Sequence, residues 1–314
     1  MSFRARRLLA LVVLAAAGCG GTLDPPSLVT KLRVLAVRAQ PADVLPGQMT
    51  TLDALVVGLA DQVDGGADPG ALDYLWLACL PPPGSSDVKD CAAAAGSLIA
   101  SGSGLQACAQ NPGAAVCLLG TEAQVQYQPA SDAAAGNVFI TMVVATVASE
   151  GAVACVRRVA GPPAASPGDS CVISLKTLKV QAAAAEINTN PAVSTFTVGP
   201  LPAGATDIHT DPPLVFKLKT KLSLQPIYQP AVASELKPNG TREVLTFSWF
   251  ATHKNFDHFH SGYAVDASGT VTERDDNTWT DDGDVPGLVF FWLVVRDDRG
   301  GVGWTDGRLA SMPP

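Results

Sequence analysis

Two stretches of the chain, LDYLWL at residues 72–77 and LTFSWF at residues 245–250, decide how it folds. Each carries an aromatic residue two positions before a tryptophan, Tyr74 before Trp76 and Phe247 before Trp249. Successive side chains alternate on a β-strand, so the two aromatic side chains of each stretch lie on one face. Because one stretch lies in each half of a chain of 314 residues, the pair indicates a structural unit that occurs twice.

A second pair of stretches repeats in the same order. GNVFITMVV at residues 136–144 matches GLVFFWLVV at residues 287–295, with a glycine first and two valines last. Two correspondences in one order support an internal repeat. Trp76 and Trp249 stand at equivalent places in the two repeats, which a fold requires and a single ligand site does not. We therefore predict that both tryptophans are core residues.

Each repeat is predicted to end in a β-hairpin. In the second repeat, VVRDDRGGVGW at residues 294–304 places a polar turn that ends in two glycines between two apolar strands. In the first repeat, a strand over residues 143–156 is expected to pair antiparallel with one over residues 171–180. The segment between them contains three prolines, which lack an amide donor, so it is predicted to be a loop.

The composition agrees with a chain of short strands. Glycine (29) and proline (24) are abundant, long helical periodicities are absent, and 47% of the residues are hydrophobic, enough to fill sizeable cores. Further strands are expected at residues 31–37, 50–57, 195–198 and 217–224. We predict an all-β protein with two sandwich domains in tandem, over residues 31–185 and 186–314.

The first domain is predicted to carry an insertion at about residues 80–122. The stretch from Trp76 to Gly136 is longer than the one from Trp249 to Gly287. The excess is rich in glycine and alanine, whose small side chains form little core, and it holds three of the seven cysteines. We expect disulfides to hold this insertion in place of a core.

The N-terminus has the three parts of a secretory signal: arginines at positions 4, 6 and 7, then an apolar run, then small residues. As a helix, residues 8–18 would rise about 16 Å, against a hydrocarbon core of about 30 Å. The run is therefore too short to span a membrane. Residues 1–18 are predicted to be a signal peptide.

The end of this signal, Ala16-Ala17-Gly18-Cys19, resembles the bacterial lipobox. The resemblance implies cleavage just before Cys19 and acylation of its sulfur and its new amino group, with residues 19–30 as a lipidated tether. Ala16 stands where leucine is usual, and the alternative is an ordinary cleaved signal with an incidental cysteine. Gly20 stands where an aspartate would signal inner-membrane retention, so the outer membrane is the expected location.

Seven cysteines are an odd number for an exported protein. Assigning Cys19 to lipid leaves an even set of six for an oxidising compartment: Cys79, Cys91, Cys108, Cys117, Cys155 and Cys171. We expect pairing in sequence order. For Cys155 and Cys171 there is a geometric reason, because paired strands at the base of a loop bring Cα atoms to about 4.5–5.5 Å. The alternatives are pairing of these two with the insertion, free buried thiols, and zinc, although no CxxC pair occurs.

The charge of the chain excludes some partners. The net charge is −8, and without the signal 18 Lys and Arg stand against 29 Asp and Glu, which gives −11. An acidic exterior argues against a nucleic-acid partner and against electrostatic docking on anionic lipid. No second apolar run approaches the length of a membrane span, so the membrane contact is predicted to be the N-terminal lipid alone.

Two loops of the second repeat carry candidate metal ligands. In HKNFDHFH the candidates are His253, His258 and His260, the last two of which would point to one face of an extended segment. In ERDDNTWTDDGD the candidate calcium ligands are Asp275, Asp276, Asp281, Asp282 and Asp284. The spacing does not fit an EF-hand. The alternative interpretation is that both are solvated polar loops.

Catalysis has little support in the sequence. The chain contains no G-x-S-x-G, no H-E-x-x-H, no P-loop and no dinucleotide-binding glycine motif at a strand-to-helix turn. We expect a protein that is not an enzyme and that uses no cofactor. An unrecognised hydrolase stays open as one alternative, and a calcium- or metal-dependent binding module as another.

Short strands, a buried tryptophan on the third strand and a last hairpin resemble bacterial immunoglobulin-like or PKD-like modules. The combination of LRVLAVRAQPADVLPGQ, the aromatic-x-Trp strand and VVRDDRGGVGW is similar to uncharacterised outer-membrane lipoproteins of myxobacteria. The sequence departs from antibody domains in one respect. Antibody domains have a disulfide between strands two and six, but the stretches expected at those places, residues 51–57 and 138–147, contain no cysteine. The resemblance implies an anchored structural or binding module that presents loops to a protein or glycan, in the periplasm or at the cell surface.

Overall fold

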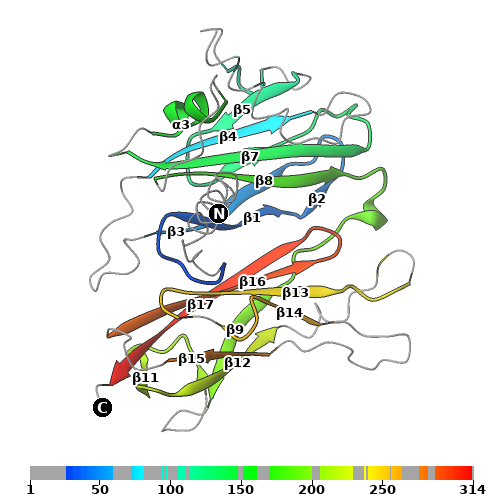
Figure 1. The fold of residues 1–314 in the computed structure, drawn as a ribbon. Coiled ribbons are helices and arrows are strands. Elements are labelled where there is room, and N and C mark those ends of the chain that lie inside the picture. Colours follow the sequence, from blue (N-terminus) through cyan, green and yellow to red (C-terminus); the bar gives the residue numbers. More distant parts are fainter. Residues whose placement is uncertain are drawn as a thin grey trace, which may run out of the picture.

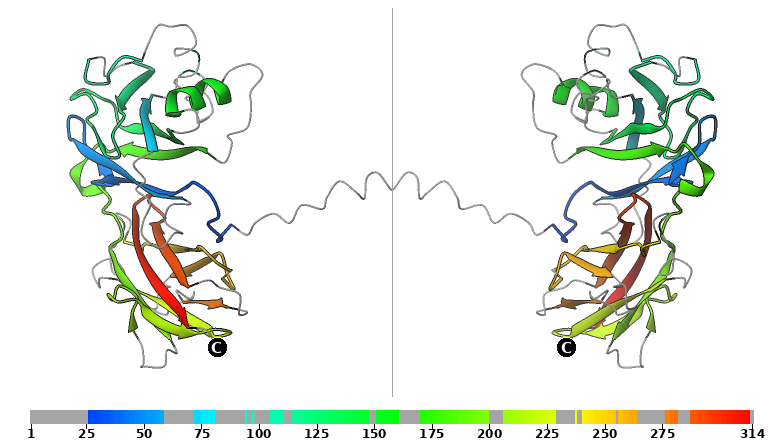
Figure 2. Two further views of the ribbon diagram at one scale, coloured as in Figure 1. Left: turned by 90° about the vertical axis from the view of Figure 1, so that its left-hand side faces the viewer. Right: turned by 90° about the vertical axis from the view of Figure 1, so that its right-hand side faces the viewer.

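The chain folds into four β-sheets stacked as layers, two for each domain (Figure 1). The structure, a computed structural model, describes residues 26–58, 72–80, 94, 97, 105–110, 114–147, 151–160, 170–199, 206–228, 237, 240–254, 256–263, 276–281 and 287–312. Figure 2 shows the two domains as two lobes, with the N-terminal strands between them.

The first domain is a sandwich of a five-stranded and a three-stranded sheet. The larger sheet contains, in spatial order, β2 (Asp43–Val44), β8 (Cys171–Val180), β7 (Gly136–Thr146), β4 (Leu72–Cys79) and β5 (Val116–Gly120). The smaller contains β1 (Arg33–Gln40), β3 (Thr50–Val57) and β6 (Val125–Tyr127). All neighbouring strands are antiparallel except β2 and β8.

The second domain repeats this plan. Its five-stranded sheet contains β11 (Leu214–Lys217), β17 (Val302–Met312), β16 (Leu288–Asp297), β13 (Leu245–Ala251) and β14 (His260–Tyr263). Its other sheet contains β10 (Thr206–Asp207), β9 (Val193–Gly199), β12 (Lys221–Tyr228) and β15 (Asn277–Thr280). A short 3₁₀ turn, η2 (Ala184–Glu186), lies on the connection between the domains.

The strand order identifies both domains as immunoglobulin-like sandwiches. Strands β1, β3 and β6 correspond to β9, β12 and β15, and the order β2-β8-β7-β4-β5 corresponds to β11-β17-β16-β13-β14. Even the parallel pairing is repeated, because β2 pairs parallel with β8 and β11 pairs parallel with β17. The predicted all-β fold with two such sandwiches in tandem is confirmed.

The two tryptophans that mark the repeat occupy the cores of the two domains. Trp76 on β4 is 0% exposed and Trp249 on β13 is 1% exposed. A buried indole N–H requires an acceptor. Trp76 Nε1 donates to the carbonyl oxygen of Glu122 at 2.9 Å, and Trp249 Nε1 donates to Ser261 Oγ at 2.9 Å. The prediction that both are core residues is confirmed.

One predicted strand is partly wrong. The strand expected over residues 143–156 ends at Thr146, and α3 (Gly151–Ala160) follows. Ala152, Cys155 and Val156 share one face at helical spacing and are buried against β4 and β7. The backbone N–H of Ala152 donates to Asp73 Oδ2 at 2.8 Å, so a carboxylate from a distant strand caps the helix. The predicted pairing of residues 171–180 holds, with β7 as the partner.

Part of the predicted insertion belongs to the sheet. Residues 116–120 form β5, which pairs with β4, and Val116 and Cys117 are buried. The segment around Ala107 in turn pairs parallel with β5, with Cys108 N donating to the Leu118 carbonyl at 2.9 Å. The expectation that this region forms little core is therefore wrong at its C-terminal end, where an apolar strand finds a sheet edge.

The alternating run at residues 217–224 is interrupted by a turn. Residues up to Lys217 belong to β11, and β12 begins at Lys221 in the other sheet. Lys219 has a φ of 64°, in the left-handed region, and its N–H donates to Asp281 Oδ2 at 2.9 Å. The alternation is that of two strands in two sheets, because the chain turns between them.

Candidate functional site

The three candidate histidines do not meet around a metal position. His253 Nδ1 lies 3.0 Å from the hydroxyl of its neighbour Thr252, whereas His260, on β14, has Nδ1 3.0 Å from Ser248 Oγ. His258 is held through its backbone N–H, which donates to Asn277 Oδ1. Within the part of the chain that the structure describes, no three His, Cys, Asp or Glu side chains form a possible metal group. The three residues belong to a turn, a loop and a strand and do not form one group, and metal binding by this loop stays a prediction.

Two of the five acidic candidates lie in the part of the chain that the structure describes, and three do not. Asp281 is 1% exposed and accepts the N–H of Lys219, so it holds the turn between β11 and β12. Asp276 is partly buried beside β15 and joins no metal group. The remaining three, Asp275, Asp282 and Asp284, lie outside the described residues.

The cysteines form disulfides in the first domain. Cys108 pairs with Cys117 and Cys155 pairs with Cys171, as expected from pairing in sequence order. The second bond joins α3 to β8 and not two strands, and its Cα atoms are 6.2 Å apart. Cys79 is also disulfide-bonded. Cys19 and Cys91 lie outside the described residues.

The most extensive site in the described residues is the joint between the two domains. The sheet with β1 and β3 packs its outer face on the sheet with β13, β16 and β17, which gives the four stacked layers of Figure 1. The two faces share one apolar cluster of buried side chains: Val29, Leu35, Ala36, Val57, Phe250, Trp292, Val294 and Val302. The joint is therefore a sheet-on-sheet interface with its own core.

The N-terminal segment strengthens this joint from one side. Leu28 pairs parallel with Ala251 at the end of β13, and Val29 N donates to the Ala251 carbonyl at 2.9 Å. In return Ala251 N donates to the Ser27 carbonyl at 3.0 Å. Arg33, on β1, places its guanidinium 5.6 Å from the ring centre of Phe250. Residues that precede the first domain in sequence thus bind the second.

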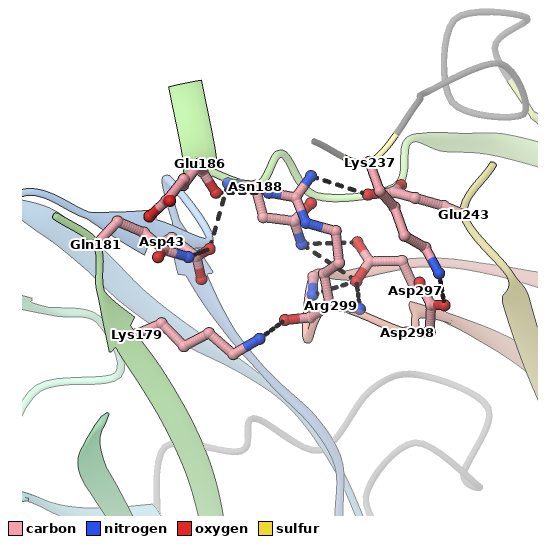
Figure 3. A network of polar contacts seen from close by, with 11 residues as sticks. Asp43, Lys179, Gln181, Glu186, Asn188, Lys237, Glu243, Asp297, Asp298 and Arg299 are labelled. Atoms are coloured by element: carbon pink, nitrogen blue, oxygen red, sulfur yellow. Dashed lines mark hydrogen bonds and ion pairs between the residues drawn. The ribbon is translucent and has the colours of Figure 1, made fainter. Parts of the chain in front are cut away.

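The turn of the β16–β17 hairpin closes the joint from the other side (Figure 3). Asp297, only 7% exposed, accepts hydrogen bonds from the N–H groups of Arg299 and Gly301, both at 2.8 Å, and from Asn188 Nδ2 at 3.0 and 3.1 Å. A Cβ on Gly301 would collide with the Asp297 carboxylate, so glycine is required there. Asn188 N also donates to Asp43 Oδ2 at 3.3 Å, which ties the hairpin to the first domain.

Two lysines of β8 reach across to the same turn. Lys176 Nζ donates to the Gly300 carbonyl, and Lys179 Nζ donates to the Arg299 carbonyl at 2.9 Å. Arg296 adds a third contact, from its Nη2 to the Leu35 carbonyl of β1 at 2.7 Å. A free immunoglobulin-like domain would expose this hairpin to solvent. Here the hairpin contacts the first domain, and these contacts hold the two domains together.

The sequence of β16 carries a signal for this joint. The run LVFFWLVV in β16 is apolar at successive positions, which indicates a strand buried on both faces. Phe291 and Leu293 face the core of the second domain, whereas Trp292 and Val294 face the first domain. The apolar residues at even-numbered positions of this run therefore indicate a second buried face.

Lys176 makes the stability of the joint dependent on pH. Its side chain is 9% exposed, and burial lowers the pKa of Lys176 from 10.5 to about 8, although Asp297 and Asp43 favour its charged form. Below about pH 8 the lysine is charged in both the folded and unfolded states, so the cost of burial is fully present. Between about pH 8 and 10.5 only the unfolded state binds this proton, so stability contributed by Lys176 rises with pH.

We therefore expect the wild type to gain free energy of unfolding relative to Lys176→Met by roughly 1 kcal/mol per pH unit over that interval. Urea denaturation of both proteins at pH 7, 8, 9 and 10 measures the difference, in which other titrating groups cancel. A difference that is flat or falls as the pH rises would show that Lys176 is not buried in its charged form.

Comparisons with known proteins place the chain in no family. No family model and no curated protein matches it. Among solved structures it is similar to the fibronectin(III)-like modules of Clostridium thermocellum CbhA, at 9% identity over 88% of this chain and 94% of that one, with a TM-score of 0.22. It is also similar to the C-terminal domain of the Streptococcus agalactiae AgI/II polypeptide BspA, at 7% identity over 87% and 99% of the two chains, with a TM-score of 0.24. Because these TM-scores are low, the fold class is assigned from the strand order of the two domains.

No helix among the described residues is long and apolar enough to cross a membrane.

Proposed function

We propose that this chain is a non-enzymatic lipoprotein that holds two immunoglobulin-like domains as one rigid body at a bacterial outer membrane and binds a partner protein. The observation that supports this proposal is the joint, in which an apolar core and a polar network fix both domains. A binding surface that is rigid before contact loses less conformational entropy on association. The net negative charge of the chain disfavours nucleic acid as the partner.

The lipid anchor belongs to the same proposal. Cys19 lies seven residues before Pro26, a stretch of at most about 25 Å when extended. Because residues 27–29 bind at the side of the joint, an anchor at Cys19 would hold both domains close to the bilayer. Periplasmic and outward-facing orientations both satisfy this geometry. The resemblance to myxobacterial-type lipoproteins is part of the proposal and agrees with this arrangement.

The anchor is tested by Cys19→Ser. We expect the variant to lose acylation and to leave the membrane fraction, because one sulfur carries the diacylglycerol and an unacylated body has no other membrane contact in this proposal. Detergent-free lysis followed by ultracentrifugation and immunoblotting measures the distribution, with mass spectrometry of the N-terminal peptide for the lipid. Retention of the variant in the pellet at the wild-type level would contradict the anchor.

A further inference from the structure

The two repeats differ in how they close one side of the sandwich. In the second domain, the connection from β13 to β14 runs along the outer edge of β15. Phe256 pairs antiparallel with Trp279, and the N–H of Asp257 donates to the Thr278 carbonyl at 2.8 Å. The Phe256 ring is 7% exposed and lies 5.8 Å from the ring of Trp249 and 6.2 Å from that of Phe291. One extended segment with one apolar anchor thus fills this side.

In the first domain, only part of the corresponding connection belongs to the described residues, and that part lies against β5. Residues 105–110 pair with β5, where Cys108 N donates to the Leu118 carbonyl and Leu118 N donates to the Gln106 carbonyl at 2.8 Å. The Cys108–Cys117 disulfide fastens them there. Strand β6, the counterpart of β15, pairs with β3 on one edge, and no strand of the described residues pairs with its other edge.

A hollow of about 540 Å³ lies beside β6 in the first domain. Its walls come from β5, β6 and the segments beside them, and they include Met49, Leu118, Leu119, Gln126, Tyr127 and Gln128. None of the lining side chains carries a charge at neutral pH, and burial raises the pKa of Tyr127 further. Met49, which lines the hollow, is 50% exposed.

We propose that this hollow binds an extended, uncharged segment of a partner protein, which adds to β6 as an antiparallel strand and places one apolar side chain inside. The second domain shows the arrangement within the same chain, with Phe256 as the anchor. Strand addition to a sheet edge is an established mode of peptide recognition, in which the backbone supplies affinity and pockets supply selectivity. The inference rests on the proposed function only in that it names the kind of partner.

The chemistry of the walls favours a peptide over a sugar. Tyr127 is the aromatic residue of the lining and is 6% exposed, so it offers no open ring face on which a sugar could stack. An unpaired strand edge presents N–H and C=O groups in the spacing of another strand. Without a charged wall, an ionised peptide side chain inside the hollow would lose hydration with no partner, which selects an uncharged segment.

The proposal is tested with the signal-free chain, beginning at residue 20, and three blocked peptides. The probe is acetyl-STTFTTS-amide, which is uncharged and has one aromatic side chain. In acetyl-STTSTTS-amide the anchor is removed, and in acetyl-STPFPTS-amide two backbone donors are removed while the anchor is kept. We expect each change to weaken binding at least about tenfold in calorimetry, because a buried aromatic side chain and paired backbone donors each contribute that much.

Two matched variants locate the binding. Ala109 is exposed and lines the hollow, so Ala109→Trp fills it without entering the core. Ala134 is also exposed in the same domain but does not line the hollow, so Ala134→Trp is the control. We expect at least about a tenfold loss of affinity for the first and none for the second. Hydrogen exchange with bound probe should show protection at Val125–Tyr127.

Each outcome decides the inference. It is supported if the probe binds, the altered peptides bind weakly and Ala109→Trp alone blocks binding. It is overturned if the probe does not bind at about 1 mM, which is the result expected if the chain itself fills the hollow. It is also overturned if the probe still binds to the Ala109→Trp variant. Because the peptides are tested on the soluble body and the anchor by fractionation of the full chain, the two proposals fail separately.

Discussion

Replacement of Trp249 by alanine is expected to lower the free energy of unfolding by about 3–5 kcal/mol. The indole is 1% exposed, makes an edge contact with Phe196 at 6.0 Å between ring centres and packs on Phe256. Alanine leaves a cavity in the middle of the sandwich and leaves Ser261 Oγ without its indole donor. A loss of this size is a large fraction of the stability of an ordinary domain. The same reasoning gives Trp76→Ala a loss of the same order.

Chemical denaturation followed by circular dichroism measures both losses. Trp304 provides a comparison within the second domain, because this tryptophan is only partly buried, against the apolar cluster of the joint and under the guanidinium of Arg38, 4.0 Å from the ring centre. We expect Trp304→Ala to cost clearly less than Trp249→Ala. If Trp249→Ala unfolded at the wild-type denaturant concentration, the role of this residue as the core of the repeat would be refuted.

The repeat could be predicted because its signals are local. The aromatic-x-Trp strands, the glycine-led apolar strands and the turn before Gly301 are each contained within about ten residues. The structure has strands at the first two kinds of signal and a turn at the third. Pairing in sequence order also suited the cysteines, since Cys108 and Cys117 lie on neighbouring segments of one sheet edge. Short-range patterns of this kind are what periodicity and turn chemistry record.

Helix α3 could not be predicted with the same ease because two patterns compete in it. Its valines suit a strand, whereas the spacing of Ala152, Cys155 and Val156 suits a helix. The cap that favours the helix comes from Asp73, on a strand far away in the sequence. Tertiary contacts decide between the patterns, and a single sequence does not show them.

The three candidate histidines show the opposite case, because residues that are close in sequence do not form one group in space. His253 contacts Thr252, whereas His260, on β14, contacts Ser248. The joint was missed because its two halves are distant. Phe250 and Trp292 face outward from their own domain, and their partners, among them Leu35 and Val57, belong to the other.

The second large effect is expected at the joint, where Asp297→Ala should lower the free energy of unfolding by about 3–5 kcal/mol. The buried carboxylate accepts the N–H groups of Arg299 and Gly301 and the Asn188 amide, and its charge favours the ammonium of Lys176. Alanine leaves these donors without their acceptor, which costs the free energy of the lost hydrogen bonds. The buried lysine also loses a nearby negative charge.

A variant of the neighbouring residue, Asp298, distinguishes the loss of buried hydrogen bonds at Asp297 from the simple loss of one negative charge. Asp298 pairs with Lys237 at the surface of the same turn, with 34% of its side chain exposed. Surface ion pairs contribute about 0–1 kcal/mol, so Asp298→Ala should change stability little. Because Asp297 connects the hairpin to Asn188, its loss should also loosen the two domains, which small-angle scattering would record as an increase in the radius of gyration. Equal stability losses in the two variants, with no change in scattering, would mean that the joint is held by its apolar cluster and not by Asp297.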